Sequence, residues 1–217
     1  MESFVLAVAS SLFVAGLTVL CGRASSMCLR AWMILLSRFT GLGVWRVAPR
    51  QQLAARQIKA ELSRARWVCV LTGRGNELTR DTFAPLWEDA GQRIESVQVL
   101  LPDSELGPSS WLSRREEDVR RIDPGFSRGL LAEQVRLNAA YIREIAHHRR
   151  AIELRFYDLP HLHRLVITDR AAYLTIYSPT EHGRNCPTLL VRRPGLMYDY
   201  ALQLFQTAWA SSHPTNT

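Results

Sequence analysis

Lysine is almost absent from this 217-residue chain: Lys59 is the only one among 27 basic residues, and the rest are arginine. The net charge of +7 therefore comes almost wholly from guanidinium groups, which favour anionic partners such as phosphate groups, nucleic acid or acidic lipid headgroups. Zinc-type spacing is absent as well, since Cys21, Cys28, Cys69 and Cys186 form no CxxC pair. These cysteines are predicted to be free thiols in a reducing compartment, and no metal or cofactor is expected.

The sequence also lacks the low hydrophobic content that is typical of disordered chains. Hydrophobic residues make up 47% of the sequence and charged residues 22%, which is enough to build a buried core. At this length the chain accommodates one ordinary domain with an appendage. The sequence therefore predicts a globular protein.

Acidic residues are absent between Glu2 and Glu61, which sets the first part of the chain apart from the rest. Residues 3–22 carry no charge, and as a helix they would reach about 30 Å, the thickness of a hydrocarbon core. We therefore expect a transmembrane anchor over residues 1–22; a cleaved signal peptide is the alternative, although no basic residue precedes the apolar run. The arginines from Arg23 to Arg50 predict, by the positive-inside tendency, that the rest of the chain lies in the cytoplasm, attached to the inner membrane.

Residues 23–66 are predicted to form a basic interfacial helix and a linker. Arginines recur every eight residues from Arg30 to Arg46. Large apolar residues occupy another side of the same helix: Leu29, Trp32, Met33, Leu36 and Phe39. A helix lying on the membrane surface fits this pattern best. A second span and an amphipathic helix packed on the following domain are the alternatives, and residues 51–66 are expected to be a polar helical linker.

From Trp67 onward the sequence alternates short β-branched runs with helical patterns. Strands are expected at WVCVLTGRGNEL, where Gly-x-Gly stops the run, and at SVQVLLPD, IELRFYD, RLVITD, AAYLTIYS and PTLLVRR. Helices are expected at DTFAPLWEDAGQRI, a short helix ending at Gly91, between Ser113 and His148 with a break at Pro124 and Gly125, and at GLMYDYALQLFQTAWASS. Strands in quick succession imply partly antiparallel pairing. We therefore predict an α/β domain over residues 67–212, a mixed sheet with helices covering it, followed by a tail at residues 213–217.

The order and content of these segments resemble a known family over residues 67–211. LTGRG ends the first strand, VQVLLPD is the second, and the strongest matches are LRFYDLPHLHRLVITDRAAYLTIY and the helix ending in LFQTAW. In these parts the chain is similar to the small, single-copy bacterial kind of phospholipase-D-like domain, of the HKD superfamily. The resemblance implies a phospholipase-D-like fold and a site for phosphoryl groups.

The signature of that family's catalytic form is only partly present. It consists of a histidine nucleophile, a lysine two residues later and an aspartate five residues beyond. When the aspartate is placed on Asp169, Arg164 takes the lysine position and Leu162 the histidine position. Residues two apart share a face of a strand, so Leu162 and Arg164 are expected to lie together while His163 points the other way. His163 would need a one-residue bulge to act as the nucleophile.

The resemblance therefore gives a degenerate motif with few candidate residues. The catalytic candidates are His163 and Asp169, and the ligand-binding candidates are Arg164, Ser178 and His161. Arg164 can hold a phosphate with two hydrogen bonds, or it can be a paired or surface charge. Asp169 can equally make a turn after its strand. A polar loop that can border a pocket follows, with His182, Arg184 and Asn185.

Two functions are compatible with these patterns. The first is a membrane-anchored cytoplasmic domain without catalysis, which binds a phosphate-containing ligand or a protein partner by analogy with bacterial signalling or defence systems. The second is a phosphodiesterase or nuclease whose site is completed across a homodimer. Nucleic-acid binding by charge alone is a weaker third hypothesis, because much of the positive excess lies beside the apolar segment, where acidic lipid accounts for it.

Overall fold

The structure is a computed structural model, and it describes residues 28–29, 31–88, 94–160, 162–178 and 181–214. The chain divides into two compact units, Met1–Leu42 and Gly43–Thr217. The described part of the first unit is helical at residues 28–29 and 31–39. The transmembrane segment expected at residues 3–22 lies outside the described residues, and among those described no helix is long and apolar enough to cross a membrane.

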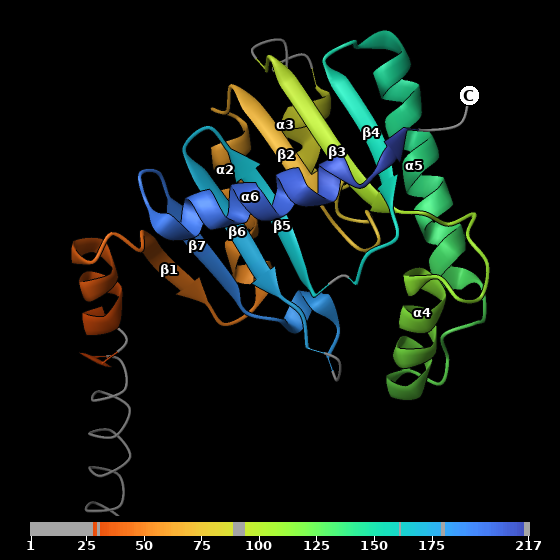
Figure 1. Cartoon of the computed structure of the whole chain (residues 1–217), viewed down its shortest axis with the longest axis horizontal. Coiled ribbons are helices and arrows are strands. Elements are labelled where there is room, and N and C mark those ends of the chain that lie inside the picture. Colours follow the sequence, from red (N-terminus) through yellow and green to blue (C-terminus); the bar gives the residue numbers. More distant parts are fainter. Residues whose placement is uncertain (1–27, 30, 89–93, 161, 179–180, 215–217) are drawn as a thin grey trace, which may run out of the picture. The chain divides into compact units, whose positions relative to one another are not determined.

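The second unit is built on one mixed sheet of eight strands, in the order β1-β7-β6-β5-β2-β3-β4-β8 (Figure 1). β2, β3 and β4 pair in parallel, and the other neighbours pair antiparallel. The bounds of the strands are β1 Val44–Ala48, β2 Trp67–Leu71, β3 Ser96–Pro102, β4 Ile152–Tyr157, β5 His163–Thr168, β6 Ala171–Ile176, β7 Thr188–Arg192 and β8 His213–Pro214.

Helices cover both faces of this sheet. α6 lies across one face, and α2, α3 and α5 pack on the other (Figure 1). The bounds of the helices and 3-10 turns are η1 Gln51–Ala54, α2 Ala55–Leu62, η2 Asp81–Phe83, α3 Ala84–Trp87, α4 Trp111–Ile122, α5 Leu130–His148, η4 Gly183–Asn185 and α6 Leu196–Ala210. The protein is thus a mixed α/β fold, as predicted.

Alternation along the strands divides the hydrophobic core into two layers. On β2, Val70 packs in the layer under α2 and α5, whereas Cys69 packs in the layer under α6. On β5, Val166 belongs to the first layer, and Leu165 and Ile167 belong to the second. Even-numbered residues of β5 therefore face α5, and odd-numbered residues face α6.

The strands predicted from residue 67 onward are confirmed, and so are the helical patterns before His148 and after Gly195. Of the short helix expected to end at Gly91, α3 ends at Trp87, and residues 89–93 lie outside the described residues. The helical pattern before His148 divides into α4 and α5, with Pro124 and Gly125 between them. Because both residues disfavour a continuing helix, the break could be predicted from the sequence.

The start of the compact unit differs from the expected domain boundary. Val44–Ala48 forms the edge strand β1 and pairs with β7. Residues 51–66 are not a linker, because Ile58 and Leu62 of α2 are buried in the core. The unit therefore begins at Gly43 rather than at Trp67. At the other end, part of the expected tail pairs with β4 as β8.

Candidate anion-binding site

The site begins at the turn that follows β2, residues 72–77. Gly75 has a φ of +83°, which side chains rarely adopt, and a Cβ there would lie 3.0 Å from Leu101 Cδ2. Asn138 of α5 holds this turn, since its Nδ2 donates to the Arg74 carbonyl oxygen at 2.9 Å and to Asn76 Oδ1 at 2.7 Å. The turn is therefore fixed against β3 and α5, and Arg74 is held at a defined place.

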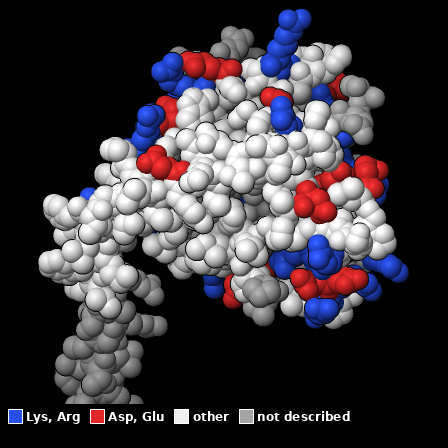
Figure 2. Space-filling view, in the orientation of Figure 1, with Lys and Arg blue, Asp and Glu red and all other residues white. Residues whose placement is uncertain are grey.

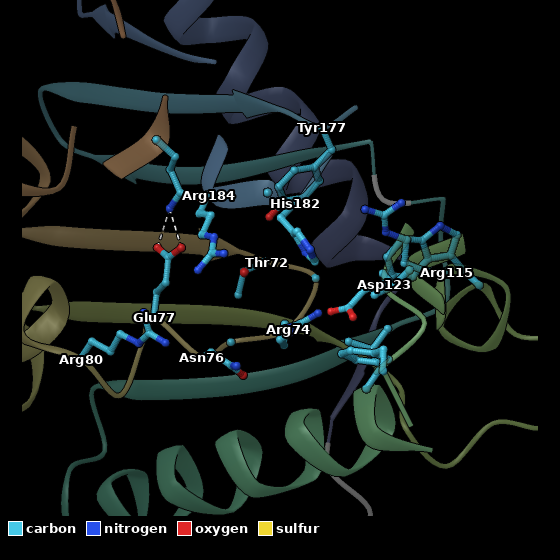
Figure 3. A pocket seen from close by; sticks show the side chains of 18 residues that line it. Thr72, Arg74, Asn76, Glu77, Arg80, Arg115, Asp123, Tyr177, His182 and Arg184 are labelled. Carbon is cyan, nitrogen blue, oxygen red and sulfur yellow. Dashed lines mark hydrogen bonds between the residues drawn. The ribbon is translucent and has the colours of Figure 1, made fainter. Parts of the chain in front are cut away.

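A cavity of about 350 Å³ opens beside this turn (Figure 3), and we call it the arginine cavity. Four parts of the chain line it: η1, the loop from the end of β2 to Arg80, the segment from α4 to the start of α5, and the loop between β6 and β7. Basic groups outnumber acidic ones in its lining. The basic side chains are Arg74, Arg80, Arg115, Arg184 and His182, and the acidic ones are Glu77 and Asp123.

Arg74 is half-buried and meets both an aromatic ring and a second arginine. Its guanidinium carbon lies 5.4 Å from the centroid of the Phe126 ring. Burial lowers the pKa of Arg74, and the charge of Arg115 lowers it further, while Tyr177 acts in the opposite direction. Arginine nevertheless stays a cation at neutral pH. Since desolvation and like charge both disfavour this cation, an anion bound beside it would be stabilised.

One of the two acidic residues in the cavity is already paired. Glu77 forms an ion pair with Arg164, and Gln51 Nε2 donates to both of its carboxylate oxygens at 2.6 Å (dashed lines in Figure 3). The other carboxylate, Asp123, accepts a hydrogen bond from the backbone N–H of Gly125 at 3.2 Å. The charge of Glu77 is neutralised by Arg164, which lies outside the cavity lining. Among the described residues, Asp123 is therefore the one lining carboxylate that can offset the charge of the four lining arginines.

Arg164, predicted to bind a ligand, is not among the residues that line this cavity. Its side chain is only 3% exposed, and its guanidinium carbon lies 5.4 Å from the centroid of the Phe83 ring. Among the described residues, its Nη2 has no hydrogen-bond partner. In this structure Arg164 is a buried charge paired with Glu77.

His163 lies on the opposite face of the sheet. β5 and β6 pair in regular antiparallel register across His163 and Arg164, so no bulge brings these two side chains to one face. His163 lines a second cavity, of about 300 Å³, together with Tyr200 and Leu204 of α6. Burial lowers the pKa of its imidazole. The alternation predicted from the sequence is confirmed, and His163 does not meet Arg164.

The remaining candidates lie outside the arginine cavity as well. Asp169 follows β5 at its far end, where its Oδ1 accepts a hydrogen bond from the Arg66 backbone N–H at 2.9 Å. The backbone N–H of Ser178 donates to Cys186 Sγ at 3.4 Å. His161 falls outside the described residues. Of the catalytic and ligand-binding candidates that the structure describes, none lines the arginine cavity.

Sequence patterns point to only part of this cavity. The loop with His182 and Arg184 was a candidate border of a pocket, and both residues do line the cavity. Arg74 directly follows a buried central strand, and strand ends of this kind commonly border ligand sites in α/β proteins. Arg115 gives no such signal, because its helix α4 carries charges of both signs throughout. Across the described residues, no group of three or more His, Cys, Asp or Glu is placed to hold a metal ion.

Comparison with known proteins gives distant structural likenesses only. No protein-family model and no curated protein sequence matches the chain. NucT from Helicobacter pylori is 12% identical with a TM-score of 0.49, over 78% of this chain and 98% of that one. Nuc from Salmonella typhimurium, a phospholipase D family member, is 13% identical with a TM-score of 0.42, over 79% of this chain and 97% of its own.

A third similar structure is TrmBL2, an archaeal chromatin protein described as showing a novel mode of DNA binding. It is 14% identical with a TM-score of 0.47, and the match covers 89% of this chain but only 63% of the archaeal protein. At these identities and TM-scores, the likenesses assign neither a family nor an activity. The function is therefore argued from the residues of the cavity.

Proposed function

We propose that this chain binds a phosphate-containing ligand in the arginine cavity and acts as a binding module rather than as an enzyme. The observation that carries the proposal is Arg74, whose pKa is lowered by burial and by Arg115 in a cavity with little free carboxylate. A phosphate group suits such a place, because each guanidinium can donate two parallel hydrogen bonds to its oxygens.

The size and lining of the cavity indicate the class of ligand. About 350 Å³ is near the lower end of the roughly 300–1,000 Å³ that ligand pockets span. Thr72 and Asn76 add neutral polar groups beside the arginines. A small phosphorylated molecule, or the phosphate-bearing end of a larger molecule or protein partner, fits this combination.

Three features support binding without turnover. Leu162 stands where the resemblance places the nucleophile. His163, the nearest substitute in sequence, points to the other face of the sheet. Arg164, at the position of the family's lysine, is neutralised by Glu77. Phosphoryl transfer through a histidine needs the imidazole within reach of the phosphate, and this strand does not provide it.

The setting that we propose is the cytoplasmic side of a membrane. It is supported by the uncharged residues 3–22 and by the arginines that follow them. There the module would respond to a phosphorylated ligand or protein partner in bacterial signalling or defence, a role that rests on the family resemblance alone.

A phosphodiesterase is the second candidate, and one observation favours it. His182 lines the arginine cavity together with Arg74 and Arg184 (Figure 3). A histidine nucleophile flanked by cations is an arrangement that phosphoryl transfer can use. Under this alternative, which a second copy of the chain could complete, turnover of bis(p-nitrophenyl) phosphate is lost in His182→Asn and retained in His163→Asn.

Two arginines of α4 offer a matched test of the binding proposal. Arg115 lines the arginine cavity, whereas Arg121 pairs with Asp118 on the surface. The full chain in detergent is titrated with pyrophosphate by calorimetry. We expect Arg115→Gln to raise Kd about 10-fold or more, because a hydrogen bond to a charged group contributes roughly 1.5–3 kcal/mol. Arg121→Gln removes the same charge and should leave Kd within about two-fold.

Equal weakening in the two variants would show attraction by net charge alone and would contradict a built site. Absence of pyrophosphate binding in the unmodified chain would contradict it as well. Raising the salt concentration should weaken pyrophosphate binding only moderately, because charges in a partly buried cavity are screened less than those on the surface.

A further inference from the structure

The helix of the first unit, described at residues 28–29 and 31–39, exposes large apolar side chains. Phe39 is 81% exposed, Leu29 64% and Met33 62%. Single exposed apolar residues are ordinary, but several on one short helix mark an interaction surface. We call this surface the apolar arc, and it consists of Leu29, Trp32, Met33, Leu35, Leu36 and Phe39.

The helical repeat gathers these residues on one side. At 3.6 residues per turn, the six positions fall within roughly 160° of the helix circumference. Arg38 falls outside the arc, as do Ser37, which is buried, and Ile34, which is half-buried. The helix is therefore amphipathic, with its apolar side exposed.

Charge distinguishes between the partners that such an arc can meet. The sequence around it is basic, with Arg23, Arg30 and Arg38 and no acidic residue between positions 3 and 60. In a dimer of two such helices, the segment would supply no carboxylate to pair with these arginines. Anionic lipid headgroups supply the missing negative charge. The twenty uncharged residues 3–22 just before the helix favour the same neighbour.

We propose that residues 28–39 lie along the surface of an anionic lipid bilayer, with the apolar arc in the boundary between headgroups and acyl chains. Trp32 and Phe39 suit this depth, because such aromatic side chains are favoured at the membrane–water interface. Arg38, outside the arc, lies at the level of the headgroups. Binding of this kind combines buried apolar area with attraction to acidic lipid. This proposal does not depend on ligand binding in the arginine cavity.

Spin labels on the full chain in nanodiscs that contain phosphatidylglycerol test the proposal. The first two native cysteines are removed by Cys21→Ser and Cys28→Ser, while Cys69 and Cys186 are buried and stay in place. Labels are attached to two positions in the arc and two outside it, through Met33→Cys, Phe39→Cys, Ala31→Cys and Arg38→Cys. Oxygen is enriched among acyl chains and a nickel chelate stays in water, so their relative access to a label reports its depth.

We expect the ratio of oxygen to nickel accessibility to be several-fold higher at positions 33 and 39 than at positions 31 and 38. A high ratio at all four positions would overturn the proposal in favour of a second span. A low ratio at all four would place the helix away from lipid, and spin–spin broadening between chains would indicate self-association through the arc. In nanodiscs of phosphatidylcholine alone the contrast should shrink, and an unchanged contrast would contradict the role of anionic lipid.

Discussion

Two cavities lie beside the two layers of the core, and their linings differ in chemistry. The arginine cavity on the α5 side contains four arginines, and Glu77 in its wall pairs with Arg164. The cavity beside α6 includes His163, and among the described residues no Arg, Lys, Asp or Glu side chain lines it. Asp199 is the only charged residue of α6, and few charges lie in the middle of this face (Figure 2). Two residues adjacent in a strand thus lie on opposite faces of the sheet and in different chemical surroundings, however close they are in sequence.

This difference bears directly on catalysis. A histidine that attacks phosphorus and a cation that stabilises the phosphoryl oxygens must face one another across the substrate. His163 and Arg164 are neighbours in the chain, yet a sheet separates their side chains. A phosphate bound on the α5 side is therefore beyond the reach of His163.

The largest loss of stability is expected when the buried ion pair between Glu77 and Arg164 is broken. Glu77→Ala leaves the guanidinium of Arg164 buried without its carboxylate, and we expect the free energy of unfolding to fall by on the order of 3 kcal/mol. Chemical denaturation of the full chain measures this loss. The double variant Glu77→Leu with Arg164→Met removes both charges and should recover most of it. Unchanged stability in Glu77→Ala would mean that Arg164 is free to meet a ligand, which would break the contrast between the two faces.

A smaller effect is expected in the turn that positions Arg74. In Gly75→Ala the alanine would have to adopt a left-handed φ, and its added Cβ would lie 3.0 Å from Leu101 and 3.2 Å from Asn138. Together these should cost about 2–3 kcal/mol of stability and shift Arg74, so pyrophosphate binding should weaken as well. Thermal unfolding and calorimetric titration measure the two losses.

Gly129 supplies the matched control for this prediction. Its φ of +81° is similar, but an added Cβ would meet nothing within 4 Å. Gly129→Ala should therefore lose only the backbone term of about 1 kcal/mol and leave pyrophosphate affinity unchanged. Equal losses in the two variants would show that close packing under Arg74 does not fix the turn.

The smallest effect concerns the other face. Burial lowers the pKa of His163 in the folded chain below the 6.5 of the unfolded chain. Between the folded and the unfolded pKa, the unfolded chain therefore binds more protons than the folded chain. Stability is therefore lost as pH falls through this window. We expect the melting temperature to decrease from about pH 7.5 to about pH 5, and to decrease less in His163→Asn. A steeper decrease in that variant would contradict the burial of a neutral imidazole.

Much of the fold could be predicted because its elements carry local signals. Buried strands such as β2 and β3 are compact runs of apolar residues, and Pro124 and Gly125 separate α4 from α5. β1 was missed because its five residues carry an arginine in the middle and gain their strand structure from pairing with β7. α2 reads as polar, and only its packing in the core shows which of its residues are buried.

The candidate site was less accessible to sequence reasoning. The directions of His163 and Arg164 follow from the period of a strand, so they could be predicted. The partner of Arg164 could not, since Glu77 lies 87 residues away and reaches it only through the β2–β5 pairing. Arg115 joins Arg74 through the placement of α4, which no local pattern encodes.

A calorimetric titration of pyrophosphate into Arg74→Gln and His163→Asn, side by side with the unmodified chain, tests the central claim most directly. That claim is that the ligand lies on the α5 side of the sheet. The predicted result is a Kd about 10-fold or more higher in Arg74→Gln and unchanged in His163→Asn. Loss of binding in His163→Asn with full affinity in Arg74→Gln would contradict the account and place the ligand beside α6.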